Sequence, residues 1–252
     1  MISFDNVLKT YDNKTVLDRV SMSLPDNKMI AFIGPNGAGK STLISIISRI
    51  LKKDDGDIII DDETLDNWNT SLLAKEISIL RQANHLSVKI TVRELVGFGR
   101  YPYSKGKLNK EDNVIIDEAI NYMGINHLED RYLNELSGGE RQMAFIAMTI
   151  AQDTKYIILD EPLNNLDMNH SVKIMKILKE LVEKKNKTIL IVIHDINFVT
   201  NYADYIVAMK DGKILFAGDT YEIITKDILK QIYDIDIDVV SLEGKSICLY
   251  YK

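Results

Sequence analysis

The sequence predicts an α/β fold in which a glycine-rich loop joins a buried strand to a helix, with short strands at the N-terminus and an inserted helical subdomain. Residues 34–42 match the pattern G-x-x-x-x-G-K-[ST], between an apolar run at 29–33 and apolar residues at helical spacing at 43–47. Residues 156–159 and 188–193 are continuous apolar runs, as expected for parallel strands covered on both faces. From residue 85 to about residue 136 the pattern is instead helical, without internal repeats.

The loop carries the residue types that a nucleotide phosphate requires. Glycine permits positive φ and close approach of the backbone, and the N-terminus of the following helix favours an anion. Lys40 is predicted to reach the β- and γ-phosphates, and the Ser41 hydroxyl to take Mg2+. An ordinary glycine-rich turn would not need the strand, helix, lysine and serine together. We therefore expect nucleotide binding by the whole loop, namely Gly34, Pro35, Asn36, Gly37, Ala38, Gly39, Lys40, Ser41 and Thr42.

The composition argues against several other classes of protein. Of the 252 residues, 46% are hydrophobic and 27% charged, which is typical of a soluble globular protein with a sizeable core. The net charge of −6 argues against a nucleic-acid surface, which is normally basic. The single cysteine, Cys248, cannot form an internal disulfide. The sequence shows no signal peptide and no apolar run long enough to span a bilayer, so we expect any membrane-spanning part to come from other chains.

The N-terminal region begins with short apolar runs at 2–7, 16–24 and 57–60, which predict strands. Tyr11 falls in the turn 9–13 between the first two, where its ring could stack on a purine or simply face solvent. Gln82 follows a predicted strand end at 77–81. A neutral amide there could coordinate Mg2+ or orient a water, although a single glutamine carries little information by itself. Helices are predicted next at 91–99 and 111–123, joined by a polar stretch at 101–107.

A second anion site is predicted at residues 136–140, the LSGGE segment, which opens a helix. Ser137 and Glu140 have the spacing of a capping box, and a cap alone would explain them. A cap does not explain two glycines in the first turn, since each costs roughly 0.5–1 kcal/mol relative to alanine. Bare residues leave the helix N-terminus open to a bulky anion. We therefore expect Ser137, Gly138 and Gly139 to face a phosphate.

Carboxylates and a histidine end two of the predicted parallel strands. Asp160 and Glu161 follow the run 156–159, at the sheet edge where open α/β folds place their ligands. Asp160 is predicted to hold Mg2+, directly or through water, and Glu161 to accept a proton from, or orient, an attacking water. His194 follows the run 188–193, where it could donate a hydrogen bond to a γ-phosphate. The remaining histidines, His85, His127 and His170, show no metal-ligand spacing and are interpreted as ordinary.

The last part of the chain is predicted to consist mainly of strands. Runs at 205–209 and 213–217 are followed by an alternation of period two at 233–239 and a further run at 247–251, which predict a terminal hairpin or strand pair. The acidic residues of the alternation could bind a cation, but a solvated strand face explains them more simply. The hairpin could also pair with another chain.

In their order along the chain, these motifs resemble the nucleotide-binding subunit of ATP-binding-cassette (ABC) proteins. The resemblance covers essentially the whole chain, and the LSGGE segment is its most specific part. It implies that ATP binds with Mg2+ and that residues 137–139 complete the ATP site of the opposite subunit in a head-to-tail homodimer with two competent sites. It also implies roles for single residues: Tyr11 on adenine, Asp167 in nucleotide binding, Glu161, His194, Gln82 and Lys40 in catalysis, and Ser41, Gln82 and Asp160 as Mg2+ ligands.

The same resemblance implies one ABC-type ATPase domain over residues 1–252. Residues 1–84 and 153–252 are expected to form the α/β core with its N-terminal antiparallel β subdomain. Residues 85–152 are expected to form the helical subdomain that carries the LSGGE segment.

Three stretches, 91–103, 160–170 and 205–212, are similar to importers of the iron–siderophore and cobalamin type. This implies an ATPase that powers ferric-siderophore uptake at the cytoplasmic face of the cell membrane. Its implied partners are permease subunits and, indirectly, a substrate-binding protein, with no nucleic acid. Glu140 and Met143 replace a glutamine and a basic residue that are common in the family, at positions that touch no phosphate. A stand-alone cassette of a soluble machine such as iron–sulfur-cluster assembly, an exporter subunit and a plain phosphotransferase remain alternatives.

Overall fold

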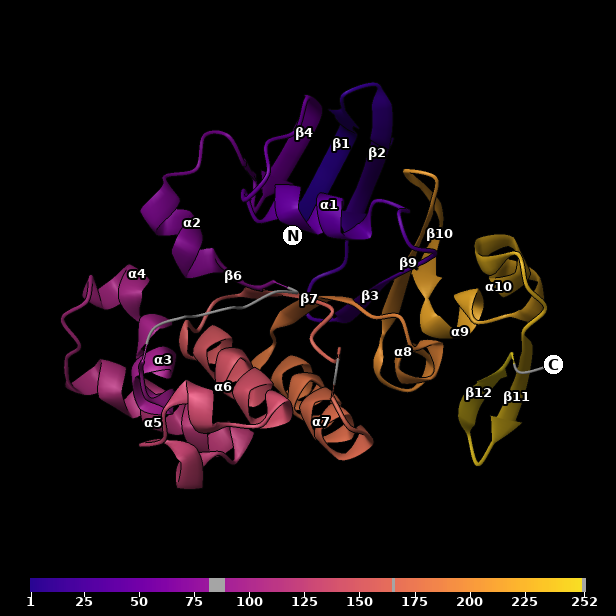
Figure 1. The fold of residues 1–252 in the computed structure, drawn as a ribbon. Helices are drawn as coiled ribbons and strands as arrows, with labels where there is room; N and C mark the ends of the chain where they lie inside the picture. Colours follow the sequence, from indigo (N-terminus) through magenta and orange to yellow (C-terminus); the bar gives the residue numbers. More distant parts are fainter. Residues whose placement is uncertain (82–88, 165, 251–252) are drawn as a thin grey trace. The chain divides into compact units, whose positions relative to one another are not determined.

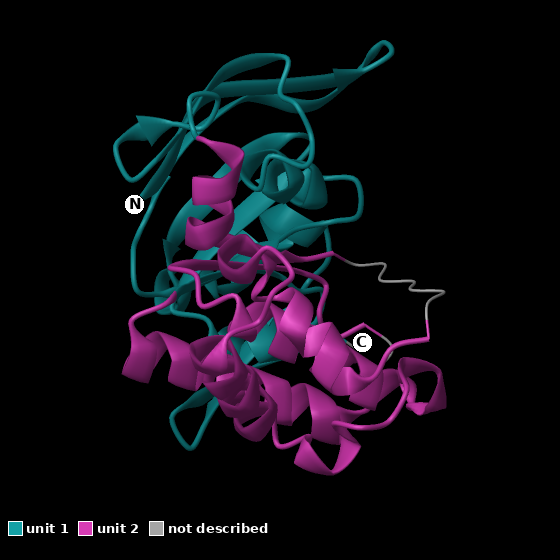
Figure 2. Ribbon diagram, turned by 90° about the vertical axis from the view of Figure 1, so that its left-hand side faces the viewer, with its two compact units in different colours: residues 1–68, 188–252 teal, residues 69–187 magenta. Residues whose placement is uncertain are grey.

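The computed structural model describes residues 1–81, 89–164 and 166–250, and in them the predicted α/β class is confirmed. The chain divides into two compact units, residues 1–68 with 188–252 (unit 1) and residues 69–187 (unit 2), coloured teal and magenta in Figure 2. Unit 1 contains the antiparallel β region and the phosphate loop. Unit 2 contains the predicted helical insertion together with the strands and helices that flank it.

Unit 1 combines strands with short helices (Figure 1). Four of its elements are additions to the sequence prediction, namely β5, α8, α9 and α10; all are short, so hydrophobic periodicity gives little signal for them. The elements of unit 1 are, in chain order, β1 (Ile2–Tyr11), β2 (Lys14–Leu24), β3 (Met29–Ile33), α1 (Lys40–Ile47), β4 (Asp55–Ile60), β5 (Glu63–Thr64), β8 (Thr188–Val192), α8 (Ile196–Tyr202), β9 (Tyr205–Lys210), β10 (Lys213–Asp219), α9 (Thr220–Ile223), α10 (Lys226–Tyr233), β11 (Asp238–Leu242) and β12 (Lys245–Leu249).

Strands β2, β1, β4 and β5 form the predicted antiparallel sheet, in that order. Its central strand is in register with both neighbours at Ile2, which lies opposite Leu24 and Ile60. All three of these side chains are buried, so the register aligns one apolar face. The strands are longer than predicted. Tyr11, expected in the turn 9–13, is instead the last residue of β1 and pairs with Lys14, because only two residues form the turn.

The phosphate loop follows the central strand of a second sheet. In unit 1 the strand order is β10, β9, β3, β8; β3 runs parallel to β9 and to β8, and β10 runs antiparallel to β9. Every residue of β3 and of β8 is buried, which explains why both are continuous apolar runs rather than alternating ones. Because β3 and β8 are parallel, the segments that leave their carboxyl ends lie at the same edge of the sheet.

The C-terminal hairpin begins later than predicted. The alternation at 233–239 suggested a strand, but Tyr233 is the last residue of α10, and β11 begins only at Asp238. The alternation does not mark a sheet face, since Ile235 is 47% exposed whereas Ile237 is buried. The hairpin is fastened to α8 by Asn197, whose side chain accepts a hydrogen bond from the Cys248 N–H (2.8 Å) and donates one to the Cys248 carbonyl (3.3 Å).

Among its described residues, unit 2 is mainly helical, with one pair of parallel strands, β6 (Ile77–Leu80) and β7 (Tyr156–Asp160). The helices predicted at 91–99 and 111–123 are confirmed as α3 and α5. Gln82, predicted to follow β6, lies outside the described residues. In the described part of the chain, no helix has both the length and the apolar character needed to cross a membrane. The elements of unit 2 are α2 (Thr70–Glu76), β6 (Ile77–Leu80), α3 (Val92–Phe98), α4 (Tyr101–Ser104), α5 (Lys110–Met123), η1 (Asn126–Leu128), η2 (Leu133–Glu135), α6 (Gly138–Ala151), β7 (Tyr156–Asp160) and α7 (Met168–Lys185).

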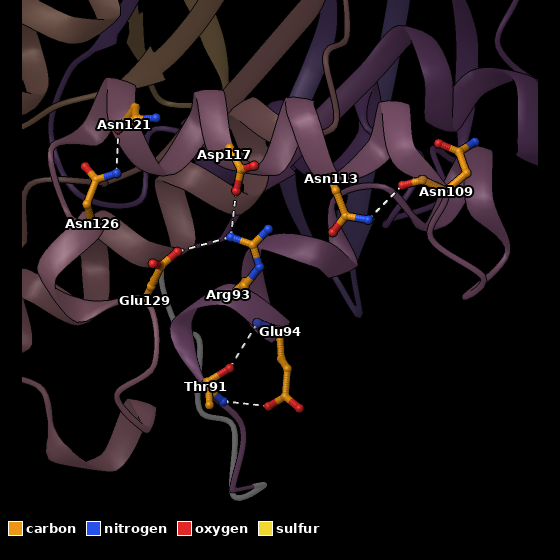
Figure 3. Close-up of polar contacts among 9 residues, drawn as sticks. All are labelled: Thr91, Arg93, Glu94, Asn109, Asn113, Asp117, Asn121, Asn126 and Glu129. Carbon is orange, nitrogen blue, oxygen red and sulfur yellow. Dashed lines mark hydrogen bonds and ion pairs between the residues drawn. The ribbon is translucent and has the colours of Figure 1, made fainter.

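Polar contacts fasten α3 to its neighbours (Figure 3). Arg93 on α3 donates through Nη1 to Asp117 Oδ1 on α5 at 2.6 Å and to Glu129 Oε2 at 3.1 Å. The hydrogen bond that Arg93 donates to Asp117 is the main cause of the raised pKa of Arg93. The helix begins with a capping box, in which Thr91 Oγ1 accepts the Glu94 N–H and Glu94 Oε2 accepts the Thr91 N–H. These contacts fix the orientation of α3.

A buried ion pair ties α5 to α6. Arg100 and Asp112 are 5% and 2% exposed, and Arg100 Nε donates to Asp112 Oδ1 at 3.0 Å. Arg100 Nη1 also donates to the carbonyl of Ala151, the last residue of α6, at 3.0 Å. Burial by itself would raise the pKa of Asp112, but the hydrogen bonds from the Asn109 backbone and from Arg100 lower it overall. The Asp112 carboxylate is therefore charged, and each of its two oxygens accepts a hydrogen bond.

We expect Asp112→Ala to lower the free energy of unfolding by about 3 kcal/mol or more, because it leaves the buried Arg100 guanidinium without its counter-charge. The matched control is Asp117→Ala, which removes a half-exposed partner of Arg93 and is expected to cost less than about 1 kcal/mol. Urea unfolding followed by circular dichroism at pH 7 measures both. Equal losses for the two variants would contradict the assignment of Arg100 and Asp112 as the structural pair.

Candidate functional site

Two glycines of the phosphate loop are required by packing inside unit 1. Gly34 has a φ of 134°, and a Cβ there would lie 1.9 Å from the carbonyl oxygen of Met209 in β9. Gly39 has a φ of 100°, and its Cβ would lie 2.7 Å from the carbonyl oxygen of Val16 in β2. Positive φ and the lack of space both select glycine at these positions. They hold the loop against β2 and β9.

Gly37 and Lys40 are placed to meet a ligand. Gly37 has a φ of 80°, and within the described residues nothing lies within 4 Å of the position that its Cβ would take. Lys40 is 5% exposed, and its ammonium donates to the carbonyl oxygens of Gly34 at 2.8 Å and Pro35 at 2.9 Å. The loop therefore combines a buried cation with the N-terminus of α1, which together favour an anion.

His194 lies at the same sheet edge as the phosphate loop. The pairing of β3 with β8 extends to Phe32 and Val192, and both Gly34 and His194 follow that pair by two residues. The His194 side chain is exposed. A residue that sequence reasoning did not assign to this region, Tyr233 at the end of α10, forms a hydrogen bond with the Gly34 backbone, and burial raises its pKa to about 12. Its position in the chain gave no signal of this contact.

Asp160 and Glu161 lie at the carboxyl end of β7 in unit 2, as predicted. Asp160 is 8% exposed, whereas Glu161 is half-buried. Glu161 has a φ of 53°, in the left-handed region that costs a side-chain-bearing residue about 1–3 kcal/mol and that is often found at functional sites. The side-chain amide of Asn164 donates to Glu161 Oε2. The turn thus presents one buried carboxylate and one accessible carboxylate with a fixed orientation.

The LSGGE segment opens α6, and its predicted capping box is confirmed. The Ser137 N–H donates to Glu140 Oε2 at 2.8 Å, and the Glu140 N–H donates to Ser137 Oγ at 3.3 Å. Hydrogen bonding from Ser137, chiefly from its backbone, lowers the pKa of Glu140. Gly138 is exposed, and among the described atoms its Cβ would meet nothing within 4 Å, but a Cβ on Gly139 would lie 3.0 Å from Nδ1 of His170. The chain's own packing therefore crowds a side chain at 139 but leaves room for a Cβ at 138.

Asp167 is the N-cap of α7. Its Oδ1 accepts the His170 N–H at 2.9 Å, and its Oδ2 lies 2.8 Å from His170 Nδ1; these contacts, the backbone one first, lower the pKa of Asp167. On α6, Gln142 donates through Nε2 to the carbonyl of Pro162 at 3.0 Å. Sequence reasoning missed His170 and Gln142. The spacing of His170 three residues after an N-cap was the one available signal, because that is where capping partners occur.

The side chains predicted to hold Mg2+ have suitable chemistry. Ser41 offers a hydroxyl in the first turn of α1, and Asp160 a carboxylate at the end of β7. Mg2+ prefers oxygen ligands and usually keeps waters and substrate phosphates, so one or two protein oxygens suffice. Accordingly, no cluster of three or more His, Cys, Asp or Glu residues able to hold a metal occurs in the described part of the chain.

The predicted site residues therefore fall into two groups, one in each unit. Unit 1 carries residues 34–42, His194 and Tyr11, whose ring is 47% exposed with the Lys9 ammonium 5.3 Å from its centroid. Unit 2 carries residues 137–139, Asp160, Glu161 and Asp167. Each group includes a glycine at a helix N-terminus, and the group in unit 2 also includes the accessible carboxylate of Glu161.

The chain is similar to known proteins over its whole length. The family model described as ABC transporter matches residues 17–164. The chain is 52% identical to the petrobactin import ATP-binding protein YclP of Bacillus subtilis (strain 168), over 100% of both chains. It is 45% identical to the petrobactin import ATP-binding protein FatE of Bacillus anthracis, over 99% of this chain and 100% of that one. The dimeric ATP-binding cassette MJ0796 in a post-hydrolysis state, bound to ADP and Pi, has a TM-score of 0.78 and 28% identity, covering 87% of this chain and 99% of that chain.

The packing of the loop predicts that two glycine substitutions differ sharply in their effect on stability. Gly34→Ala is expected to disrupt unit 1, because the new methyl group would overlap the Met209 carbonyl. Gly37→Ala is expected to cost only the left-handed backbone, roughly 1–2 kcal/mol. Thermal unfolding compares them directly. Similar decreases in Tm would show that Gly34 is not held against β9 as described.

Proposed function

Because the chain belongs to the ABC transporter family of ATP-binding proteins, we propose that it powers the import of a ferric siderophore through a separate membrane permease. The chain is an ABC-type ATPase. The observation that carries the transport proposal is its 52% identity, over the full length of both chains, to a petrobactin import ATP-binding protein. The further steps concern how its own residues bind ATP, hydrolyse it and pass the effect to the permease.

ATP is proposed to bind with its β- and γ-phosphates in the loop 34–42. The ammonium of Lys40, which contacts the carbonyls of Gly34 and Pro35, would turn to phosphate oxygens, with which a cation forms stronger hydrogen bonds than with neutral carbonyls. The open space beside Gly37 leaves the loop backbone accessible to the phosphates. The exposed ring of Tyr11 supports its proposed role as the stacking surface for adenine.

Glu161 is proposed as the general base of hydrolysis. A water oxygen bonds to the γ-phosphorus as its proton passes to the Glu161 carboxylate, and the bond between the γ-phosphorus and the bridging oxygen breaks with its electron pair leaving on ADP. Asn164 supports this role, since its amide holds one oxygen of Glu161. His194 is proposed to donate to the γ-phosphate. Bound Mg2+, held by Ser41 and Asp160 and, in the proposal, Gln82, would neutralise part of the phosphate charge.

Two copies of the chain are proposed to close head to tail around ATP. In that arrangement Ser137 and Gly138 of one copy meet the phosphates held by the loop of the other. The exposure of Gly138 at the N-terminus of α6 supports this, because a bulky anion has free access there. Met168, beside Asp167, is 80% exposed, which suits a surface that a second copy covers. The similar cassette MJ0796 is itself dimeric.

The permease is proposed to dock on an apolar surface of unit 2. A pocket of about 360 Å³ lies between α3 and the stretch that follows it, with Ile90, Phe98, Tyr101 and Leu108 in its lining. Three of these side chains are unusually exposed for their size: Phe98 by 54%, Tyr101 by 62% and Leu108 by 44%. Exposed apolar groups gathered around a pocket are typical of interaction sites. The docking surface overlaps the stretch 91–103, where the sequence is similar to importers.

A ferric siderophore is proposed as the solute because of the relatives. The two similar proteins from Bacillus species are both named for petrobactin import. Petrobactin loaded with iron is therefore the first solute to assay. A substrate-binding protein is expected to deliver it to the permease, with this chain at the cytoplasmic face of the membrane.

Glu161→Gln is expected to lower ATP hydrolysis by about 100-fold or more, because the amide cannot accept the proton of the attacking water. ATP binding should persist, so the variant should accumulate as a dimer with ATP and Mg2+, measurable by size-exclusion chromatography with light scattering. Lys40→Ala is the control that should neither bind ATP tightly nor dimerise. Turnover of Glu161→Gln at the wild-type rate would show that another group is the base.

Phe98→Asp is expected to abolish uptake of 55Fe-petrobactin by cells in which the variant is the only copy, because it places a charge in the docking surface. The purified variant should hydrolyse ATP like the wild type. Val114→Asp is the matched control: Val114 on α5 is 55% exposed but lies outside the pocket, so uptake should continue. Normal uptake with Phe98→Asp would show that the permease docks on a different surface. Uptake of a different iron chelate, but not of petrobactin, by wild-type cells would change the proposed solute.

A further inference from the structure

His170 joins two of the predicted site segments of unit 2, although its sequence context gave it no role. It lies in the first turn of α7, and its side chain is 29% exposed. Its imidazole lies against Gly139 in the first turn of α6 and bonds Asp167, the N-cap of α7. One ring therefore contacts the LSGGE segment and the residue predicted to take part in nucleotide binding.

The ring presents its face to Gly139. The position that a Gly139 Cβ would take lies 3.0 Å from Nδ1, 3.1 Å from Cγ and 3.2 Å from Cε1 of His170. Three ring atoms at nearly equal distances indicate a contact with the face, because an edge contact at Nδ1 would leave the other two much farther away. All three distances are shorter than ordinary van der Waals contact. A methyl group at 139 would therefore require the imidazole or the start of α6 to shift by a few tenths of an ångström.

The edge of the same ring is fixed by Asp167. Nδ1 lies 2.8 Å from Asp167 Oδ2, and the backbone N–H of His170 donates to Oδ1 at 2.9 Å. Both oxygens of the carboxylate therefore contact the same residue. With its edge held by Asp167 and its face against Gly139, the imidazole cannot move without disturbing one of the two segments.

A second contact holds α6 one turn farther along. Gln142 Nε2 donates to the carbonyl oxygen of Pro162 at 3.0 Å, and Pro162 directly follows Glu161. The first two turns of α6 are thus attached to the chain segment that runs from β7 to α7. The His170 contact lies closer to Ser137 and Gly138 than the Gln142 contact does, since Gly139 directly follows Gly138.

We propose that His170 is a positioning residue that couples the LSGGE segment to the Asp167 turn, so that Ser137 and Gly138 meet the phosphate of the opposite copy in one orientation. The proposal rests on the proposed role of residues 137–139 in ATP hydrolysis. It also separates the two glycines: Gly139 is bare to receive the imidazole, and Gly138 is bare to receive the nucleotide. In this proposal His170 acts through the backbone of α6.

A double-mutant cycle between positions 139 and 170 tests the coupling with the full-length chain. Gly139→Ala is expected to lower kcat for ATP about tenfold or more, because the methyl group displaces the imidazole. His170→Ala makes room for that methyl group, so the double variant should return to within about threefold of His170→Ala alone. A titration with a fluorescent ATP analogue should show unchanged affinity in every variant, because the proposed nucleotide loop is in unit 1.

Two variants at position 170 separate positioning from simple filling of space. His170→Asn keeps an N–H donor close to the place of Nδ1, whereas His170→Leu fills the space without a donor. Asn is expected to retain kcat within about threefold of the wild type, and Leu to lower it about tenfold with the same Tm and nucleotide affinity. Equal kcat values for Asn and Leu would overturn the role of the bond to Asp167.

Gly138→Ala distinguishes failure of this proposal from failure of the proposed function. Its methyl group meets no described atom of its own chain within 4 Å, so a loss of activity reports contact with the opposite copy or its nucleotide. Suppose that Gly138→Ala is inactive and that the loss of kcat in the double variant equals the product of the losses in Gly139→Ala and His170→Ala. The His170 proposal is then overturned and the proposed function stands. If Gly138→Ala hydrolyses ATP like the wild type, the phosphate role of residues 137–139 is wrong, and the positioning role with it. If Gly138→Ala is inactive and the kcat of the double variant lies within about threefold of that of His170→Ala, the His170 proposal and the proposed function are both supported.

Discussion

The phosphate loop depends on the contact between the bare Cα of Gly34 and the carbonyl of Met209 in β9. That contact determines where the chain leaves β3, and the close approach of Gly39 to β2 determines where α1 begins. Between these two points the loop curves around the ammonium of Lys40, which its own carbonyls hold in place. The shape of the loop is therefore set by backbone packing within unit 1.

The two helix N-termini that carry the proposed chemistry are built differently. The N-cap of α1 is Gly39, which has no side chain to accept a backbone N–H, so the first turn of that helix is left to a ligand. The N-cap of α6 is Ser137, whose hydroxyl accepts the Glu140 N–H while Glu140 in turn accepts the Ser137 N–H. The cap fixes the start of α6, while Gly138 stays exposed. The N-terminus of α1 is therefore suited to surround a ligand, whereas the N-terminus of α6 is suited to be placed against one.

The sequence was sufficient to predict features that local pattern determines. The loop 34–42, the strands β3, β7 and β8, the capping box at Ser137 and the strand-end positions of Asp160, Glu161 and His194 all follow from short motifs beside apolar runs. It did not predict contacts between segments far apart in the chain, such as Tyr233 with Gly34, or His170 with Gly139. The alternation at 233–239 was misleading because the period of two there includes the exposed Ile235 and the last residue of a helix. Both glycines of the LSGGE segment look alike in sequence, and only the position of the imidazole distinguishes them.

The open space beside Gly138 has a consequence for genetics. Because no described atom of the same chain lies within 4 Å of the position that a Cβ at 138 would take, a chain with alanine there should fold, accumulate and pair with its normal counterpart. In the proposed head-to-tail dimer the substituted chain would then inactivate an ATP site whose phosphate loop belongs to the normal chain. A cell that carries both alleles would make mixed dimers as well as normal ones, and only dimers of two normal chains would have both sites intact. Alleles at this position should therefore be dominant-negative, and a screen based on protein abundance would pass over them.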